Sequence, residues 1–267
     1  MILFPNAKIN IGLAVTEKRL DGYHNIESIF VPVPLCDTLE ILPSKDFQFL
    51  NYGLTIDGNW EQNICVKAYQ LFKSKFDISP VRILLHKNIP MQAGLGGGSS
   101  DAAFTLIGLN KIFNINLTNE QLTYYASMLG SDCAFFTQNT PCFATGKGEI
   151  LEPVSLNLSG YFIKIVKPQV HISTVKAYQH IQPQKNIVSF KQIILKKNLQ
   201  DWKNHLFNDF ENHAFIEYPI LSKIKKEMYN EGALFAGMTG SGSAIFGIYN
   251  SMPTSINKNV FCWISKL

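Results

Sequence analysis

Residues 90–100 read PMQAGLGGGSS and place four glycines within five positions, between two apolar stretches. A backbone without side chains lets several N–H groups converge on one anion. A helix that begins there turns the positive end of its dipole toward the same point. An ordinary turn needs only one or two glycines. The segment is therefore interpreted as a phosphate-binding loop, with a glycine-rich turn that holds no ligand as the alternative.

The residues on both sides of the loop fit this interpretation. Val81, Ile83 and Leu85 alternate along the preceding stretch, which predicts a strand. Ser100 is suited to cap the apolar helix predicted over 101–113. A strand, a glycine-rich loop and a helix thus follow one another, as phosphate binding requires.

The loop departs from the better-known phosphate-binding motifs. The nearest segment to G-x-x-x-x-G-K-[ST] is Gly146-Lys147-Gly148, which has glycine where a hydroxyl is needed. A dinucleotide fingerprint fails because Ser99 stands at the third glycine position. The H-R-D and D-F-G motifs of protein kinases are absent from the sequence. A phosphate would therefore be held by a loop of another kind.

Length and composition indicate a globular protein with room for two domains in its 267 residues. Pro5, Lys8 and Asn10 interrupt the apolar N-terminal segment, and no run approaches the roughly 18 apolar residues that cross a bilayer. Five widely spaced cysteines without a C-x-x-C pair indicate neither a disulfide framework nor a zinc site. We therefore expect a cytoplasmic protein without a membrane partner.

The net charge of +4 does not by itself indicate nucleic-acid binding. Lysine pairs occur only at 196–197 and 225–226, and such pairs are typical of solvated helix faces. A dispersed basic surface can equally favour a small anionic substrate. No nucleic-acid partner is expected.

Apolar periodicity predicts a mixed α and β chain. Strands are predicted at 7–15, 27–32, 38–42, 81–89, 160–166, 243–249 and 260–264. Helices are predicted at 63–76, 101–113, 118–129, 189–197 and 221–230. The sequence T-N-E-Q at 118–121 is close to a capping box. A break at Glu152-Pro153 predicts two domains, 1–153 and 154–267.

Phosphoryl transfer also needs a cation that offsets charge and a group that orients or deprotonates the acceptor hydroxyl. Lys8 and Asn10 share one face of a strand whose other face is apolar. Lys8 could therefore project into a site, or could be a solubilising lysine on an edge strand. Asp132, within LGSDCAFF, could be a base or a helix N-cap. Asp101 is predicted to lie in the first turn of the helix that follows the loop. Its carboxylate would complement the helix dipole there, and this role is favoured over that of a metal ligand.

Two further segments could contact ligands. Tyr23 and His24 follow Asp21-Gly22, and this turn could present a ring for stacking beside a hydrogen-bonding imidazole, or could be an ordinary β-turn with a packed tyrosine. The small-residue segment 237–243 precedes a predicted strand. It could close over phosphates or simply form a tight turn.

Taken together, these segments resemble the GHMP family of small-molecule kinases. The resemblance rests on PNAKIN at 5–10, PMQAGLGGGSSDAA at 90–103 and GMTGSGSAIF at 237–246. The turn at 21–24 followed by Asp37-Thr38, the LGSDCAFF segment and FNDFE at 207–211 are similar to the branch whose substrate is a cytidine diphosphate-linked methylerythritol. The implied fold is a two-domain α+β kinase, with an N-terminal domain like the second domain of ribosomal protein S5 and a ferredoxin-like C-terminal domain.

The resemblance also implies roles for single residues. Lys8 and Asp132 would form the catalytic pair, in which Asp132 accepts or orients the hydroxyl proton. Tyr23 and Tyr178 would clamp the cytosine, and Asn10 and His24 would contact the substrate. ATP would bind to the loop, with Mg²⁺ whose protein ligands are not assigned. The loop residues implied are Pro90, Met91, Gln92, Ala93, Gly94, Leu95, Gly96, Gly97, Gly98, Ser99 and Ser100.

The chain departs from the family pattern around the aspartate, where Ser131, Cys133 and Ala134 stand in place of the usual alanine, valine and proline. Thr239 replaces a frequent serine and keeps the hydroxyl. The nearest alternative is a GHMP kinase acting on homoserine or mevalonate, which would not need Tyr23 and Tyr178. An RNA-binding protein or a nucleotide-binding regulator without catalysis is a further alternative. A monomer or weak homodimer is expected.

Overall fold

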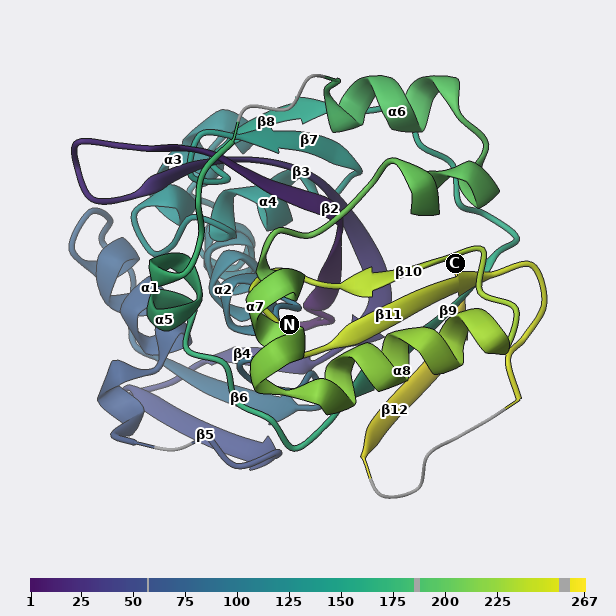
Figure 1. Cartoon of the computed structure of the whole chain (residues 1–267). Helices are drawn as coiled ribbons and strands as arrows, with labels where there is room; N and C mark the ends of the chain where they lie inside the picture. Colours follow the sequence, from purple (N-terminus) through teal and green to yellow (C-terminus); the bar gives the residue numbers. More distant parts are fainter. Residues whose placement is uncertain (57, 185–187, 255–259) are drawn as a thin grey trace. The chain divides into compact units, whose positions relative to one another are not determined.

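A computed structural model describes residues 1–56, 58–184, 188–254 and 260–267, and it contains both helices and strands (Figure 1). The described chain forms two compact units. The first unit comprises 1–7, 35–91 and 96–140, and the second comprises 8–34, 92–95 and 141–267. Because the segments of the two units are interleaved along the sequence, the division into domains 1–153 and 154–267 stays a prediction.

The first unit contains a four-stranded sheet in the order β1-β4-β6-β5, in which β5 runs parallel to β6 and the other pairs are antiparallel. Its strands are β1 (Ile2–Leu3), β4 (Thr38–Pro43), β5 (Gln48–Gly53) and β6 (Val81–Lys87). Its helices are the 3₁₀ turn η1 (Trp60–Gln62) and α1 (Ile64–Lys73), α2 (Gly97–Ile112), α3 (Asn119–Ser127) and α4 (Cys133–Gln138). Alternate residues such as Ile41 and Ile83 bury one face of the sheet in a core with Phe72 of α1 and Leu106 of α2.

The second unit contains most of a sheet in the order β2-β3-β7-β8 and an antiparallel sheet in the order β10-β11-β9-β12. The strands are β2 (Asn6–Lys18), β3 (His24–Cys36), β7 (Cys142–Thr145), β8 (Ile150–Pro153), β9 (Phe162–Lys167), β10 (Phe235–Met238), β11 (Ile245–Tyr249) and β12 (Phe261–Lys266). The helices are α5 (Thr174–Gln179), α6 (Phe190–Lys196), η2 (Leu199–Asn204), α7 (Phe210–Glu217) and α8 (Pro219–Asn230). All the predicted strands and helices have counterparts in these elements. The prediction of a mixed α+β chain is confirmed.

The start of α2 corrects the sequence prediction. The helix begins at Gly97 rather than at residue 101, and Gly96 occupies the N-cap position with φ of +69°. Glycine disfavours a helix interior, which is why the prediction placed the start later, but the first turn tolerates glycine because its N–H groups have no partner within the helix. Ser100 therefore lies inside the helix and is not its cap. Asp101 lies beyond the first turn, so the predicted dipole role for it is wrong.

The capping box predicted at 118–121 is confirmed. Gln121 N–H donates to Thr118 Oγ1 at 3.3 Å, and Gln121 Oε1 accepts from the backbone N–H of Thr118 at 2.9 Å. Two N–H groups at the start of α3 are thereby satisfied by side chains. This helix start follows from local sequence alone.

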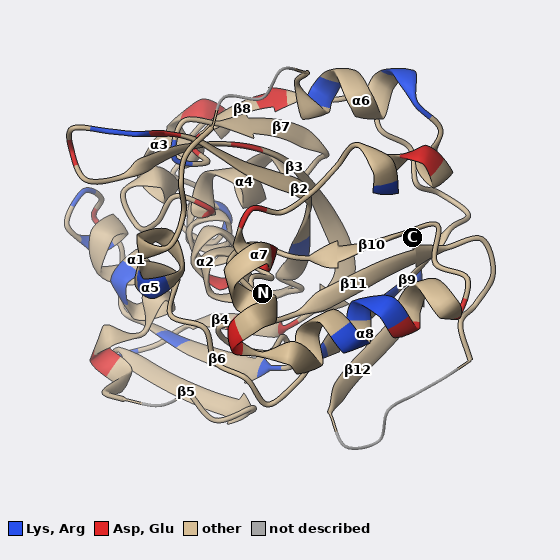
Figure 2. Ribbon diagram, viewed as in Figure 1, with Lys and Arg blue, Asp and Glu red and all other residues tan. Residues whose placement is uncertain are grey.

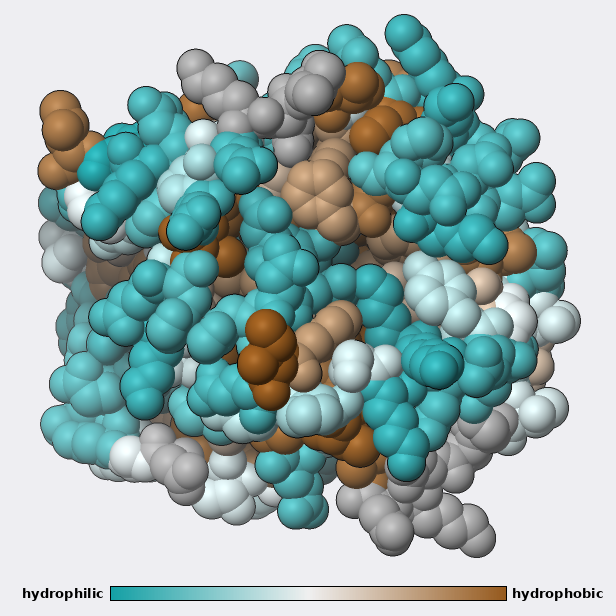
Figure 3. All heavy atoms as spheres, in the orientation of Figure 1, coloured by the Kyte–Doolittle hydropathy of each residue, from teal (hydrophilic) through white to brown (hydrophobic). Residues whose placement is uncertain are grey.

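Charged residues are distributed over many elements (Figure 2). Lys223, Lys225 and Lys226 lie on α8, where the Lys225 ammonium pairs with Glu211 at 2.6 Å. On the face drawn in Figure 3, hydrophilic side chains predominate, with hydrophobic residues between them. Among the described residues, no helix combines the length and the apolar character that crossing a membrane would require.

Candidate active site

The glycine loop enters α2 through residues 96–100 of the first unit. A Cβ on Gly97 would lie 2.9 Å from Ile89 Cγ2 and 3.0 Å from Lys87 Nζ, so a side chain at this position would force its neighbours to move. The first N–H groups of a helix lack intrahelical acceptors and can bind an anion. The buried Ser100 Oγ finds no hydrogen-bond partner among the described residues. The loop thus offers N–H groups and a hydroxyl that could donate hydrogen bonds to phosphate oxygens.

Residues 92–95 of the same loop pack within the second unit against the segment after β10. Gly94 has φ of +74°, and Thr239 Oγ1 donates to its carbonyl oxygen at 2.9 Å. The N–H of Ala244 donates to the carbonyl of Ala93 at 3.2 Å. A Cβ on Gly94 would lie 1.9 Å from the carbonyl oxygen of Thr239. The small residues of the two loops therefore permit close contact between two backbones.

Lys8 belongs to a buried polar network in the second unit. Its side chain is only 3% exposed, and its ammonium donates to Asn10 Oδ1 at 2.7 Å and lies 4.6 Å from the centre of the Phe30 ring. Asn10 Nδ2 donates to Ser28 Oγ at 2.9 Å, and the N–H of Asn10 donates to Thr239 Oγ1 at 3.1 Å. The interpretation of Lys8 as a solubilising surface lysine is therefore wrong.

The buried Lys8 ammonium requires contacts that compensate for its loss of water. Removing an ammonium from water is costly unless hydrogen bonds and charges compensate it. The Lys8 side chain is held by Asn10 and by the face of Phe30, and the backbone N–H of Lys8 donates to the carbonyl of Leu95 at 2.9 Å. The lysine is thus fixed beside the segment 92–95 of the glycine loop, as a cation serving a phosphate site would be.

Asp132 directly precedes α4 in the first unit. It occupies the N-cap position, but its backbone is helical, with φ of −79° and ψ of −12°, and its side chain makes no capping hydrogen bond. The interpretation of Asp132 as an N-cap is therefore not supported by its geometry. Burial raises the pKa of the neighbouring Cys133 thiol to about 12, so this thiol stays protonated near neutral pH. Since Lys8 and Asp132 lie in different units, their pairing stays a prediction.

Tyr178 and His24 stack in the second unit, with ring centres 4.9 Å apart and planes inclined by 20°. Burial, with a smaller effect of Lys18, lowers the pKa of His24, so its imidazole is neutral near pH 7. Tyr23 is 57% exposed, and the Lys147 ammonium lies 4.5 Å from the centre of its ring. The predicted aromatic residues therefore offer one exposed ring and one ring already stacked on an imidazole.

The sequence analysis missed the buried Ser28, and it gave the buried Asn208 only as part of the FNDFE segment that carries the family resemblance. Ser28 links Asn10 to the backbone, since its hydroxyl donates to the carbonyl of Gly12 at 2.6 Å. Asn208 donates to the carbonyls of Met238 and Gly240 at 2.8 Å each. For Ser28 the only signal available was a polar residue beside an apolar stretch. That signal does not say which partner the residue will find.

Comparisons with known proteins place the chain in a family. Residues 63–146 match the GHMP kinases N terminal domain, and residues 189–254 match the GHMP kinases C terminal domain. A 4-diphosphocytidyl-2-C-methyl-D-erythritol kinase of Bacteroides thetaiotaomicron is 49% identical, with 100% of both chains covered. The kinase of the same name from Cytophaga hutchinsonii is 47% identical, covering 97% of this chain and 96% of that protein.

The crystal structure of a 4-(cytidine 5'-diphospho)-2C-methyl-D-erythritol kinase is similar in fold, with a TM-score of 0.78 and 30% sequence identity. The match covers 93% of this chain and 90% of the other. The chain therefore belongs to the GHMP kinases, and within them to the family of the 4-diphosphocytidyl-2-C-methyl-D-erythritol kinases. Membership of this family makes the chain an ATP-using enzyme with a small-molecule substrate, and it confirms the two-domain GHMP kinase fold expected from the sequence.

Proposed function

We propose that this enzyme transfers the γ-phosphoryl group of Mg-ATP to the 2-hydroxyl of 4-diphosphocytidyl-2-C-methyl-D-erythritol, in the non-mevalonate route to isoprenoid precursors. The observation that carries the proposal is the 49% identity, over the whole of both chains, to a relative that bears the name of this kinase. The buried Lys8 and the glycine loop supply two of the features that phosphoryl transfer requires.

The loop residues 90–100 would hold the phosphates of ATP. Backbone N–H groups at the start of α2 and the hydroxyl of Ser100 are donors suited to phosphate oxygens. Bound Mg²⁺ would neutralise charge on the β- and γ-phosphates, and phosphate oxygens with water satisfy the preference of this ion for oxygen ligands. The Lys8 ammonium would offset charge near the transferred group, and Asn10 holds that ammonium in place.

Asp132 would accept or orient the proton of the acceptor hydroxyl. Its side chain is not engaged in capping α4, so the helix does not depend on it for that bond. A positioned carboxylate of this kind contributes to catalysis by lowering the cost of proton removal as the new bond forms. Lys8 and Asp132 together would serve as the catalytic pair.

The cytidyl group would be bound through Tyr23, His24 and Tyr178. The Tyr178 ring is already stacked on His24, and the exposed ring of Tyr23 faces the Lys147 ammonium. The neutral His24 imidazole can donate one hydrogen bond and accept another, which suits the polar edge of a base or a sugar.

Replacing Tyr23 with alanine is expected to weaken binding of the cytidyl substrate, while ATP binding is retained. Stacking of a base on an aromatic ring contributes about 1–3 kcal/mol. The Michaelis constant of each substrate, measured with the other at saturation, checks this expectation. An unchanged constant for the cytidyl substrate would argue against stacking on Tyr23. Tyr52, a half-exposed tyrosine of β5, provides the control substitution.

The proposed activity is tested by measuring ADP release from Mg-ATP with the cytidyl-methylerythritol substrate, and in parallel with homoserine and with mevalonate. We expect turnover with the cytidyl compound alone. Turnover with another acceptor would keep the kinase class but overturn the substrate. Absence of turnover with all three would favour a nucleotide-binding regulator.

We further propose that the enzyme is cytoplasmic and acts as a monomer or weak homodimer, without a nucleic-acid or membrane partner. The dispersed lysines (Figure 2) support the absence of a nucleic-acid partner, because nucleic-acid binding uses clustered basic residues and weakens steeply as salt rises. Gel filtration at two protein concentrations checks the oligomeric state.

A further inference from the structure

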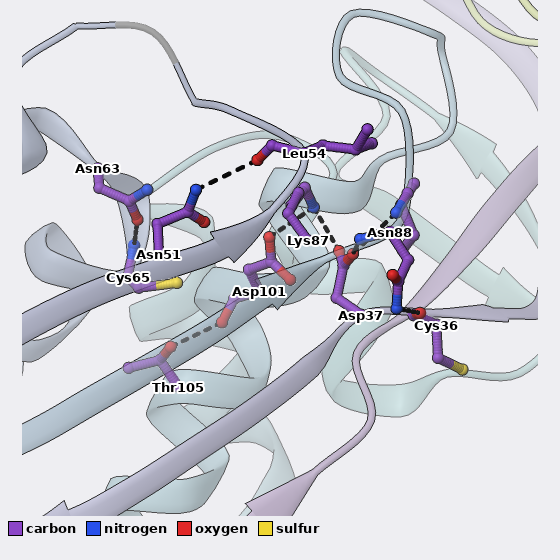
Figure 4. Close-up of polar contacts among 11 residues, drawn as sticks. Cys36, Asp37, Asn51, Leu54, Asn63, Cys65, Lys87, Asn88, Asp101 and Thr105 are labelled. Atoms are coloured by element: carbon purple, nitrogen blue, oxygen red, sulfur yellow. Dashed lines mark hydrogen bonds and ion pairs between the residues drawn. The ribbon is translucent and has the colours of Figure 1, made fainter. Parts of the chain in front are cut away.

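Lys87, the last residue of β6, lies in a buried ionic cluster of the first unit (Figure 4). Its side chain is 2% exposed and points between the carboxylates of Asp37 and Asp101, which are also buried. The ammonium donates to Asp101 Oδ2 at 2.7 Å and forms a second ion pair with Asp37 Oδ2. None of these three residues has a part in the chemistry proposed above.

Burial and the contacts between Lys87, Asp37 and Asp101 determine the charges in this cluster. Burial alone would lower the pKa of Lys87, but the carboxylates of Asp101 and Asp37 outweigh it and raise that pKa, so the ammonium stays charged. Burial raises the pKa of Asp101 well above its usual value. Removing Lys87 would take away the cation that both buried carboxyl groups face, which is a costly arrangement.

The cluster touches the chain where it enters the glycine loop. Asp37 Oδ1 accepts the N–H groups of Asn88 at 2.6 Å and Ile89 at 2.8 Å, directly after β6 ends. Asn88 Nδ2 also donates to the carbonyl of Cys36 at 3.2 Å. The backbone of residues 88–89 is thus fixed by a carboxylate that is itself fixed by Lys87.

The same cluster touches the helix that leaves the loop. Asp101 lies in α2, and its backbone carbonyl accepts the hydroxyl of Thr105 at 2.7 Å. The Lys87 ammonium would lie 3.0 Å from a Cβ on Gly97, so it packs directly beneath the first turn of α2. One ammonium thereby connects the two ends of the loop, which includes Gly94 and Gly96 before α2 begins.

We propose that Lys87, Asp37 and Asp101 form an ionic clamp that holds the two ends of the glycine loop in their nucleotide-binding conformation, and so sets the affinity for ATP. They are positioning residues, because they act on the loop and not on the transferred phosphoryl group. Glycine-rich segments lose much conformational entropy when they are ordered. A loop that is ordered before ATP arrives avoids this cost on binding. The proposal rests on ATP binding at the loop, as part of the proposed function, and does not depend on the identity of the acceptor.

Lys87→Met is the first test, with binding of the non-hydrolysable analogue Mg-AMPPNP measured by calorimetry at a temperature where the variant is folded. We expect the dissociation constant to rise about 10-fold or more, since the loop must then be ordered by the ligand. Because no acceptor is present, the result is independent of the reaction proposed above. If the unchanged chain did not bind Mg-AMPPNP, the proposal that ATP binds at the loop would be wrong, and the clamp proposal that rests on it would be wrong as well.

Lys164→Met is the matched control. Lys164 is a second buried lysine on a strand, and its ammonium pairs with Glu231 at 2.7 Å in the second unit. We expect a lower melting temperature for this variant, with the Mg-AMPPNP dissociation constant within about 2-fold of the unchanged chain because the loop is not touched. Equal effects of the two substitutions on Mg-AMPPNP binding would overturn the clamp.

Asp101→Ala covers the case in which Lys87→Met does not fold. This change leaves Lys87 paired with Asp37, so no buried charge loses its partner, and alanine suits the helix. We expect weaker binding of Mg-AMPPNP, by about 3-fold or more, with kcat at saturating ATP retained. Lys87→Arg, which keeps the charge, should recover part of the affinity. Unchanged binding in Asp101→Ala would show that the cluster supports folding only.

Discussion

Replacing Asp132 with alanine is expected to lower kcat by about 100-fold or more, which is the usual loss when a positioned acid–base group is removed. Because the Asp132 side chain does not cap α4, the change removes no capping hydrogen bond and the helix should survive it. Binding of Mg-ATP should be largely retained. Rapid-quench measurement of a single turnover at saturating ATP reports the chemical step directly.

Asp77→Ala provides the control for this substitution. Asp77 is an exposed aspartate in the same unit, between α1 and β6, and its removal should leave kcat unchanged. If Asp132→Ala retained the full single-turnover rate, Asp132 would have no part in the reaction. If its loss of activity came with a melting temperature lowered by many degrees, the residue would be structural, and the uncapped geometry at the start of α4 would need another explanation.

The fold could be predicted wherever local sequence determines the structure. Residues 7–15 alternate in polarity and lie in β2, and the capping box places the start of α3. The start of α2 could not be predicted in the same way, because propensity disfavours glycine in a helix while the first turn accepts it. The short α4 was not predicted, because its first four residues are all apolar and its six residues show no helical period.

The candidate site could be predicted in its residue types but not in its contacts. Lys8 and Asn10 were placed on one face of a strand, and they do share a hydrogen bond. The contact between Asn10 and Thr239 joins residues 229 positions apart, which no local pattern reveals. Likewise, Lys87 and Asp37 lie 50 positions apart, and a single charged residue beside an apolar strand is typical of a solvated lysine rather than a buried one. Tertiary packing selected these pairs.

Gly94→Ala is expected to destabilise the protein by about 2–5 kcal/mol, because a left-handed backbone with a Cβ costs about 1–2 kcal/mol and forced overpacking adds a similar amount or more. Gly94 has φ of +74°, and its Cβ would lie 1.9 Å from a carbonyl oxygen of Thr239. That oxygen belongs to backbone and cannot rotate away, so the loop or the segment after β10 must shift. Denaturant unfolding measures the loss, and we expect Mg-ATP binding to weaken with it.

Gly98→Ala separates the close contact at Gly94 from a general need for glycine in the loop. Gly98 lies in the first turn of α2, and its Cβ would meet only Ile64 Cγ2, at the ordinary distance of 3.9 Å. Alanine there should leave stability unchanged or raise it by about 0.5–1 kcal/mol, since it restricts the unfolded chain. Two neighbouring glycines are thus expected to respond in opposite directions to the same substitution. A Gly94→Ala variant as stable as Gly98→Ala would mean that the contact between Gly94 and Thr239 yields without cost, and the fixed geometry argued for the loop would then be wrong. Equal destabilisation by both substitutions would instead indicate a general need for glycine in the loop.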